Sequence, residues 1–187
     1  MTTGSPRFAR TARPTSQSGF TLIELLIVVA MIAVLATIAF PILLRARIAA
    51  HEGTAVASLR TIHSAEAAFA STCGAGGYAQ SLEDLALKPV GSTVAFITDP
   101  YNTNGVLVNG YIASVMAASG ATTLLPAANT CNNSADDAVT SFVGERHPRA
   151  IGETGVRSFA IDTQGAMYMR QDGATIDDAL AGTLVFQ

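Results

Sequence analysis

The pattern of apolar and polar positions changes twice along the chain. From Leu25 to Leu44 the residues are apolar except for Thr37 and Pro41. About 20 apolar residues form an α-helix long enough to cross the ~30 Å hydrocarbon core of a bilayer. The pattern therefore predicts a long helix whose first half, residues 20–44, spans a membrane.

The helix is predicted to continue through residues 45–72, but with apolar positions on one side only. These positions recur at helical spacing, at Val56, Leu59, Ile62 and Phe69. A helix with one apolar stripe packs that stripe against a protein core. The opposite side carries polar residues that we expect to face solvent, namely Glu52, Arg60, His63 and Glu66.

Residues 73–187 have the short, interrupted patterns of a globular head. Glycines within 73–77 end the long helix, and Ser81 is placed to cap a short helix over 81–85. We predict strands at 110–116, 157–162, 166–170 and 182–186, and loops at 91–109 and 117–140. The expected fold class is α+β, with a long N-terminal helix packed against a small antiparallel β-sheet.

Charge is distributed unevenly between these parts. Residues 1–19 carry three arginines and no acid, whereas residues 73–187 carry 11 acids and 5 bases. Positive charge just before an apolar run favours a cytoplasmic N-terminus, which places the head outside the cytoplasm. An acidic head lacks the clustered Lys and Arg that bind a phosphate backbone, so we predict no nucleic-acid partner.

One acid, Glu24, lies within the segment predicted to be membrane-embedded. A charge at the centre of a membrane helix costs roughly 2.5–3.5 kcal/mol on insertion scales, so an intramembrane acid indicates a functional site with a partner. The helix offers no cation near Glu24, and we expect the partner to come from another molecule. Two interpretations, a secretory signal peptide cut near 37–39 and a plain membrane anchor, leave this acid unexplained. A third interpretation comes from the residues around Glu24.

The run Gly19-Phe20-Thr21-Leu22-Ile23-Glu24, with a basic leader before it and an apolar tail after it, resembles the processing motif of type IV pilins and type II secretion pseudopilins. The resemblance implies that a prepilin peptidase cleaves between Gly19 and Phe20 on the cytoplasmic side and methylates the new amino group of Phe20. Residues 1–19 would then be a cleaved leader, and Glu24 would be the fifth mature residue. Pro41 falls where many pilins carry a proline that loosens the helix.

The resemblance also implies how the mature chain assembles. Glu24 of one copy would pair with the Phe20 amine of a neighbour, which favours one axial register because an unpaired buried charge is costly. The predicted function is a structural subunit of a type IV pilus filament, with no reaction of its own. Two alternatives stay open: a pseudopilin of a type II secretion system, and a monomeric membrane-anchored binding module outside the cytoplasm.

The expected partners follow from the same resemblance. They are copies of the chain, the prepilin peptidase/methyltransferase, an inner-membrane assembly platform with its ATPase, and a secretin, with membrane lipid around the helix before assembly. The monomer is expected in the bacterial inner membrane. The assembled form is expected at the cell surface as a pilus or in the periplasm as a pseudopilus.

The two cysteines, Cys73 and Cys131, do not form a C-x-x-C pair. In a head outside the cytoplasm we expect them to form a disulfide, with two unpaired thiols as the alternative. The sequence contains no G-x-S-x-G, H-E-x-x-H or phosphate-loop motif, and we predict no catalytic residue and no cofactor.

Metal binding is not predicted either. His63 and Glu66 share a helix face, which is better explained as a solvated surface than as a pair of ligands. An acidic group near the C-terminus (Asp172, Asp177 and Asp178) makes a calcium site an alternative, but surface charge explains it better because the spacing matches no calcium loop.

Overall fold

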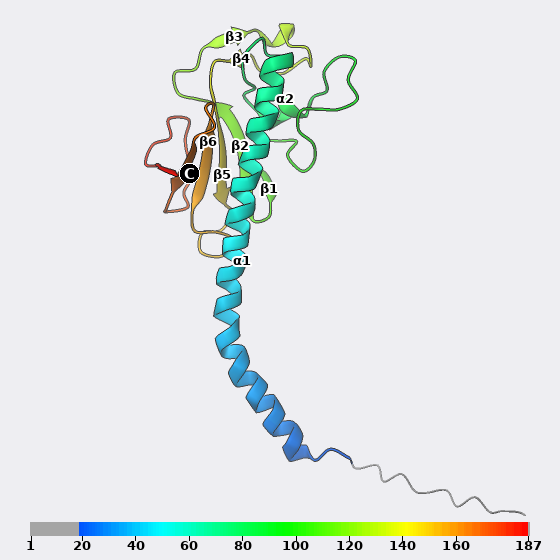
Figure 1. The fold of residues 1–187 in the computed structure, drawn as a ribbon, viewed down its shortest axis with the longest axis vertical. Coiled ribbons are helices and arrows are strands. Elements are labelled where there is room, and N and C mark those ends of the chain that lie inside the picture. The colour runs from blue at the N-terminus through cyan, green and yellow to red at the C-terminus, as the bar shows by residue number, and fades with distance from the viewer. Residues whose placement is uncertain (1–18, 187) are drawn as a thin grey trace, which may run out of the picture. The chain divides into compact units, whose positions relative to one another are not determined.

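The computed structural model describes residues 19–186, and the chain divides after Pro41 into two units that are described separately. One helix, α1 (Leu22–Thr72), belongs to both units. Pro41 lies inside α1, although a proline lacks the amide hydrogen of a helical residue. The helix predicted through residue 72 is therefore confirmed (Figure 1).

The first unit contributes residues 19–41 to the described structure. Every side chain in this range is exposed, including the apolar ones. Within residues 19–186, α1 is the one helix that is long and apolar enough to cross a membrane. Exposed apolar surface on all sides of a helix requires lipid or other helices around it.

The second unit is a head built on an antiparallel sheet of six strands in the order β1-β2-β5-β6-β7-β8. The strands are β1 (Val106–Val108), β2 (Tyr111–Ala117), β5 (Phe142–Pro148), β6 (Ser158–Asp162), β7 (Met167–Arg170) and β8 (Leu184–Phe186). The smaller elements are α2 (Leu82–Ala86), the 3-10 helix η1 (Ala127–Asn129) and a second pair of strands, β3 (Thr123–Leu125) and β4 (Ala138–Val139). The α+β prediction is confirmed.

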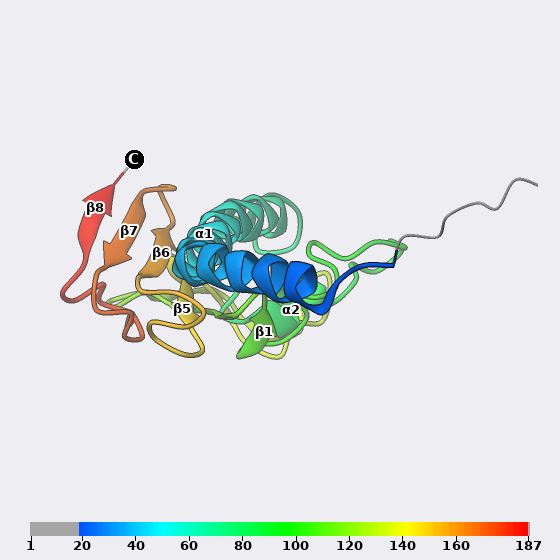
Figure 2. The same cartoon turned by 90° about the horizontal axis from the view of Figure 1, so that it is seen from below.

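The second part of α1 lies across one face of the sheet (Figures 1 and 2). The predicted stripe supplies the contact: Leu59, Ile62 and Phe69 are fully buried. The approach is close at Gly144 in β5, where an added Cβ would lie 3.5 Å from Ile62 Cγ2 and 3.2 Å from Ile161 Cγ2. Helix and sheet thus share one core, and a glycine at this position lets them pack closely.

On the opposite face of the sheet, Ile176 and Leu180 pack from the segment 171–183, which connects β7 to β8. Ile176 from this segment is fully buried against Val143 and Ala160. Its amide donates a hydrogen bond of 3.2 Å to the buried carboxylate of Glu145. The sheet therefore has apolar contacts on both faces.

The strands predicted in the head are found as β2, β6, β7 and β8, and Ser81 caps α2 by accepting a hydrogen bond of 3.2 Å from the Asp84 amide. Two parts of the prediction are wrong. β1 lies in a segment predicted as loop, and so do β3 and β4. β5, which pairs with both β2 and β6, was not predicted at all.

The sequence of β5 does not show the pattern of a strand, because Phe142–Pro148 include a glycine, two charged residues and a proline. Two of them, Glu145 and Arg146, are completely buried. The Arg146 Nη2 donates to the carbonyl of Val108 at 2.8 Å, and its guanidinium lies 5.3 Å from the ring centre of Tyr101. These partners lie on other elements, so the burial of charge in β5 depends on the assembled sheet.

Candidate functional site

Gly19 and Phe20 precede α1 in an exposed stretch of chain without regular secondary structure. A Cβ added at Gly19 would have no heavy atom within 4 Å. The Phe20 side chain is 85% exposed. The peptide bond predicted to be cut is thus accessible to an enzyme, and Gly19 makes no packing contact of its own.

The first turn of α1 is closed by reciprocal hydrogen bonds between Thr21 and Glu24. The Glu24 amide donates to Thr21 Oγ1 at 3.3 Å, while the amide and the hydroxyl of Thr21 donate to Glu24 Oε2 at 3.0 and 2.7 Å. This is a capping box, in which a Thr and a Glu three residues later satisfy each other's free helix-end groups. Glu24 therefore has a structural role in its own chain as well as the predicted role between chains.

The sequence prediction missed this role of Thr21, although the signal was present as Thr-x-x-Glu directly before an apolar run. It also considered only a partner in another molecule for Glu24. Glu24 also has an uncharged hydrogen-bond partner, Thr21, within its own chain. Among residues 19–186, the Glu24 side chain receives hydrogen bonds at Oε2 alone, and Oε1 has no protein donor.

The capping box places the two groups of the predicted ion pair at fixed positions. Thr21 precedes the first residue of α1, and Phe20 lies one residue further out. The start of a helix carries the positive end of its dipole, which favours the Glu24 carboxylate and disfavours an amine at Phe20. A new amino group at Phe20 would therefore gain from a carboxylate close to it.

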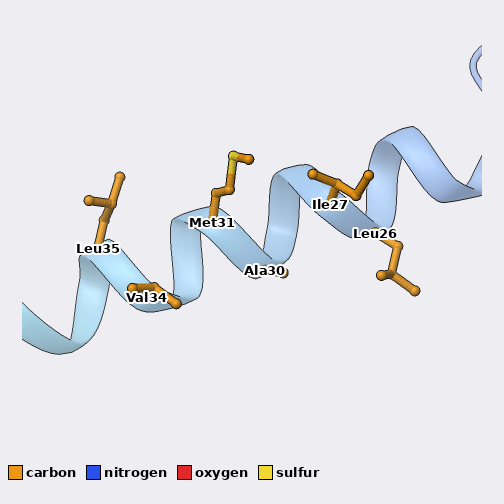
Figure 3. A pocket seen from close by; sticks show the side chains of 6 residues that line it. All are labelled: Leu26, Ile27, Ala30, Met31, Val34 and Leu35. Atoms are coloured by element: carbon orange, nitrogen blue, oxygen red, sulfur yellow. The ribbon is translucent and has the colours of Figure 1, made fainter.

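A wholly apolar groove runs along α1 beyond this turn. Figure 3 shows its side chains in two rows, with Ile27, Met31 and Leu35 in one row and Leu26, Ala30 and Val34 in the other. Members of each row are four residues apart, which is the spacing of the ridges that interdigitate when two helices pack. Ala30 has the smallest side chain of its row, so this row projects least at its middle. The surface suits a neighbouring apolar helix better than a small molecule, because it offers no polar group.

The polar side of α1 in the head differs from the prediction. Glu52 and Glu66 are buried, so the expectation that they face solvent is wrong. Their positions extend the apolar stripe, because 52 precedes 59 by seven residues and 66 follows it by seven, which is two helical turns. The stripe therefore contains two carboxylates, and each must find donors within the head.

Glu52 joins α1 to the chain entering β6. Its Oε1 accepts the amides of Val156 and Arg157 at 3.1 and 3.2 Å, and its Oε2 accepts Arg157 Nε at 3.0 Å together with Arg157 Nη2. Burial alone would raise the pKa of Glu52, but these hydrogen bonds and the guanidinium charge outweigh it and lower the pKa. The ion pair therefore favours the folded head at neutral pH and loses its contribution as the pH falls through the lowered pKa.

Replacing Arg157 with Met should destabilise the head by about 1–3 kcal/mol, because Glu52 stays buried without its cation while the outer side of Arg157 is screened by solvent. Urea unfolding of the full chain in detergent micelles, followed by tyrosine fluorescence, measures this loss. In Glu52→Gln/Arg157→Met the loss should be smaller, since no buried charge remains. A loss that stayed the same at neutral and at acidic pH would contradict this role of the ion pair.

Glu66 is completely buried, and Oε2 accepts the amide of Ala79 at 2.9 Å while Oε1 has no partner among the described residues. Burial raises the pKa of Glu66 well above its ordinary value, an effect that the Ala79 amide opposes and the charge of Asp84 increases. Asp84 is buried as well, and one of its oxygens also lacks a partner there. A carboxyl with a raised pKa binds its proton more tightly in the folded state than in the unfolded state. The stability of the head therefore falls as the pH rises above the pKa that Glu66 has in the unfolded chain.

Glu66→Gln should therefore flatten the dependence of stability on pH. We expect the variant to gain about 1 kcal/mol or more over the native head at neutral and alkaline pH, because the amide keeps an acceptor for Ala79 without a charge to bury. The free energy of unfolding, measured in urea from acidic to alkaline pH, tests this. If the free energy of unfolding depended on pH in the same way in the variant and in the native chain, protonation of Glu66 would not be the cause of that dependence.

The structure does not bring the histidines together. His51 Nδ1 lies 3.1 Å from the carbonyl oxygen of Thr154, His63 Nε2 lies 3.2 Å from that of Thr163, and His147 Nδ1 lies 2.7 Å from Glu145 Oε1. Over residues 19–186 no group of three or more His, Cys, Asp and Glu side chains is arranged to hold a metal ion. In the acidic group near the C-terminus, Asp172 pairs with Arg170 at 2.8 Å.

The two cysteines lie together. A disulfide joins Cys73, just after the last residue of α1, to Cys131 in the segment that follows η1. In the chain-entropy estimate, closing a loop of this length restricts the unfolded state by roughly 4 kcal/mol. The bond thus fixes the C-terminal end of α1 to the head.

These features define a class of protein with an apolar N-terminal helix and a β-sheet head, a pilin-like arrangement. Residues 14–40 match the protein-family model described as the prokaryotic N-terminal methylation motif. This motif is the hallmark of type IV pilin and pseudopilin precursors, and it supports this class for the chain. Comparison with curated proteins and with solved structures gave no match.

The motif implies processing by a prepilin peptidase and polymerisation of the mature chain with copies of itself. It suggests a structural protein. Together with the apolar start of α1, it fits anchoring in the inner membrane followed by assembly at the surface.

Proposed function

We propose that residues 20–187 are the mature subunit of a type IV pilus filament that polymerises through the start of α1. The single observation that carries the proposal is the methylation motif at 14–40 immediately before and within an exposed apolar helix. An exposed helix of this kind must exchange lipid for other helices when it leaves the membrane. In a polymer, other helices would surround the apolar start of α1, so it would not be exposed to water.

Processing prepares the ion pair. Cleavage between Gly19 and Phe20 would create a cationic amine one residue before the capping residue Thr21. The Glu24 carboxylate, held by Thr21 at Oε2, would present Oε1 to the amine of a neighbouring copy. A buried cation and carboxylate that satisfy each other are tolerated where either alone is costly, and this makes the pair selective for one axial register.

In the membrane we propose that the N-terminus is cytoplasmic and the head lies outside, because residues 1–19 carry arginines and no acid. The proposed domain limits are a leader over 1–19, a membrane and filament-core segment over 20–44, an amphipathic segment over 45–72 and a head over 73–187. The assembly platform, its ATPase and a secretin remain proposed partners. We also propose that Pro41 loosens α1.

Intact-mass and N-terminal mass spectrometry of the protein from cells with a prepilin peptidase tests the processing step. We expect a chain that starts at Phe20 and carries one added methyl group. A chain that keeps Met1 would overturn the proposal and favour a membrane-anchored binding module.

A pseudopilin of a secretion system is the second candidate, since the same motif serves both assemblies. Deletion of the gene separates the two. Loss of surface fibres that contain this chain is expected for a pilin. A secretion defect in cells that never had such fibres would favour the pseudopilin.

A further inference from the structure

The apolar segment of α1 ends within the unit that carries the head. Its last residues, Ile42, Leu43 and Leu44, are exposed, at 63%, 64% and 44%, and the charged Arg45 follows directly. In the proposed membrane location, the hydrocarbon ends at Leu44 and a layer of lipid headgroups surrounds the next turns of α1. The part of the head beside these turns therefore faces the membrane surface.

The β5–β6 loop (residues 149–157) is the end of the sheet nearest to the apolar segment. Gly144 in β5 packs at the level of Ile62, whereas the carbonyl oxygen of Thr154 lies 3.1 Å from His51 Nδ1, so the loop lies beside α1 at residue 51 (Figure 1). The helical rise places His51 about 10 Å beyond the end of the apolar segment, and a headgroup layer is about 5–7 Å thick. Side chains that project from the loop can thus reach this layer.

The loop exposes apolar side chains next to a cation. Ile151 and Val156 are 59% and 45% exposed. They lie together, since a Cβ added at Gly173 would be 3.2 Å from Ile151 Cγ1 and 2.7 Å from the Val156 carbonyl oxygen. Arg149 is exposed and forms no ion pair with any residue in 19–186. Exposed apolar side chains beside a cation are typical of surfaces that bind the boundary between anionic headgroups and acyl chains.

Arg45 and Arg47 add two cations at the level of the headgroups. Both are exposed, and within the described part of the chain neither forms an ion pair. Residues two apart on a helix differ by about 200° in direction, so the two arginines point to opposite sides of α1. One protein surface could contact only one of them, whereas a headgroup layer surrounds the helix and contacts both. Arg47 lies one turn before His51, on the side of the β5–β6 loop.

We propose that the β5–β6 loop, together with Arg45 and Arg47, binds anionic phospholipid headgroups and holds the head of the unassembled chain on the membrane surface. The inference rests on the proposed membrane location of α1 and goes beyond filament formation. Charge complementarity and continuity with the lipid-facing apolar segment favour lipid as the partner. Each subunit would then lose these headgroup contacts when it leaves the membrane.

The charges in the rest of the head make this contact directional. Residues 73–187 carry 11 acids and 5 bases, so an anionic surface repels most of the head and attracts only its basic end. Glu153 is an exposed acid within the loop itself. It opposes the attraction, which therefore depends on the arginines.

Fluorescence quenching of the full chain in lipid nanodiscs tests the contact. Cys73 and Cys131 are already joined, so Ile151→Cys supplies a single free thiol for an apolar fluorescent label. Leu124→Cys is the matched control, because Leu124 is 50% exposed in β3, whose partner strand β4 pairs with Tyr78 just beyond the C-terminal end of α1. With a quencher on the headgroups of phosphatidylglycerol discs, the label at residue 151 should be quenched several-fold more than the label at residue 124. In phosphatidylcholine discs this difference should largely disappear.

Charge variants of the Ile151→Cys chain identify the cations. Arg149→Gln and Arg47→Gln should each lower the ratio of bound to free heads about fivefold in phosphatidylglycerol discs, as expected for the loss of one arginine near an anionic surface. High salt should lower the same ratio. Glu153→Gln should raise it, and Arg60→Gln, on α1 within the head, should leave it unchanged.

Three results would overturn the contact: equal quenching of the two labels, equal quenching of residue 151 in the two lipids, or a loss in Arg60→Gln as large as that in Arg149→Gln. Weaker quenching in Glu153→Gln would point to a protein cation as the partner and would also overturn it. A chain that fails to insert into the discs would instead contradict the membrane location of α1, so the two failures are distinguishable.

Discussion

A chain carrying Glu24→Leu should enter the membrane at least as well as the native chain and yet form almost no filaments. Insertion should improve because a carboxylate within the hydrocarbon is replaced by an apolar side chain. Assembly should fail because the amine of a neighbour's Phe20 would be buried without a partner. Removing one member of a buried ion pair costs about 3–5 kcal/mol, which corresponds to a loss of two orders of magnitude or more in association.

The capping box makes a sharper control possible. Glu24→Gln keeps an oxygen that can accept hydrogen bonds from Thr21, but it removes the negative charge. Thr21→Ala removes the cap and leaves the charge in place. We expect Glu24→Gln to assemble as poorly as Glu24→Leu, and Thr21→Ala to keep most of the native yield.

The measurements are membrane fractionation for insertion and electron microscopy with quantified shearing for filaments. Normal filaments from Glu24→Gln would show that the hydrogen bonds at the start of α1, and not an ion pair between copies, are what assembly needs. Loss of insertion in Glu24→Leu would contradict a membrane location for this turn.

The second large effect is expected from Gly19→Leu, which should block maturation and leave the full-length chain in the membrane. A Cβ at Gly19 meets open space in the structure, so the substitution does not disturb the chain itself. The effect must then arise where the peptidase approaches the backbone, since only glycine leaves that side of the chain unobstructed. Less than about a tenth of the molecules should be cleaved, by analogy with other losses of close substrate positioning.

Intact-mass measurement of the membrane fraction checks this result, because the proposed cleavage would remove residues 1–19 and the methylation that follows it would add one methyl group. Gly19→Ala, with a single added carbon, should be processed at an intermediate rate. The head should remain disulfide-bonded and folded in both variants. Efficient maturation of Gly19→Leu would show that the cleavage site lies elsewhere.

Much of the architecture could be predicted because it is encoded in contiguous residues. The helix ending at Thr72, the cap at Ser81 and the hairpin of β6 and β7 all follow from local periodicity and turn residues. The N-terminal motif is equally local, since its residues are consecutive. The capping box is encoded just as locally, in the three-residue spacing of Thr21 and Glu24.

Strand β5 shows where local patterns stop. Its buried Glu145 and Arg146 would be prohibitively polar for a strand inside the sheet if they were considered alone. Ile176 and Val108 provide their hydrogen bonds from 31 and 38 residues away. A pattern that considers only neighbours in the sequence cannot supply these partners, and it therefore rejects the strand.

By itself the sequence determined the membrane helix and the processing motif, because both consist of consecutive residues whose chemistry is sufficient without a fold. The tertiary structure alone decided which polar side chains of α1 are buried and which strand completes the sheet. Glu52 and Glu66 occupy stripe positions, and donors on Arg157 and Ala79 make their burial tolerable. The cost of burying a charge depends on groups that only the folded chain brings within hydrogen-bond distance.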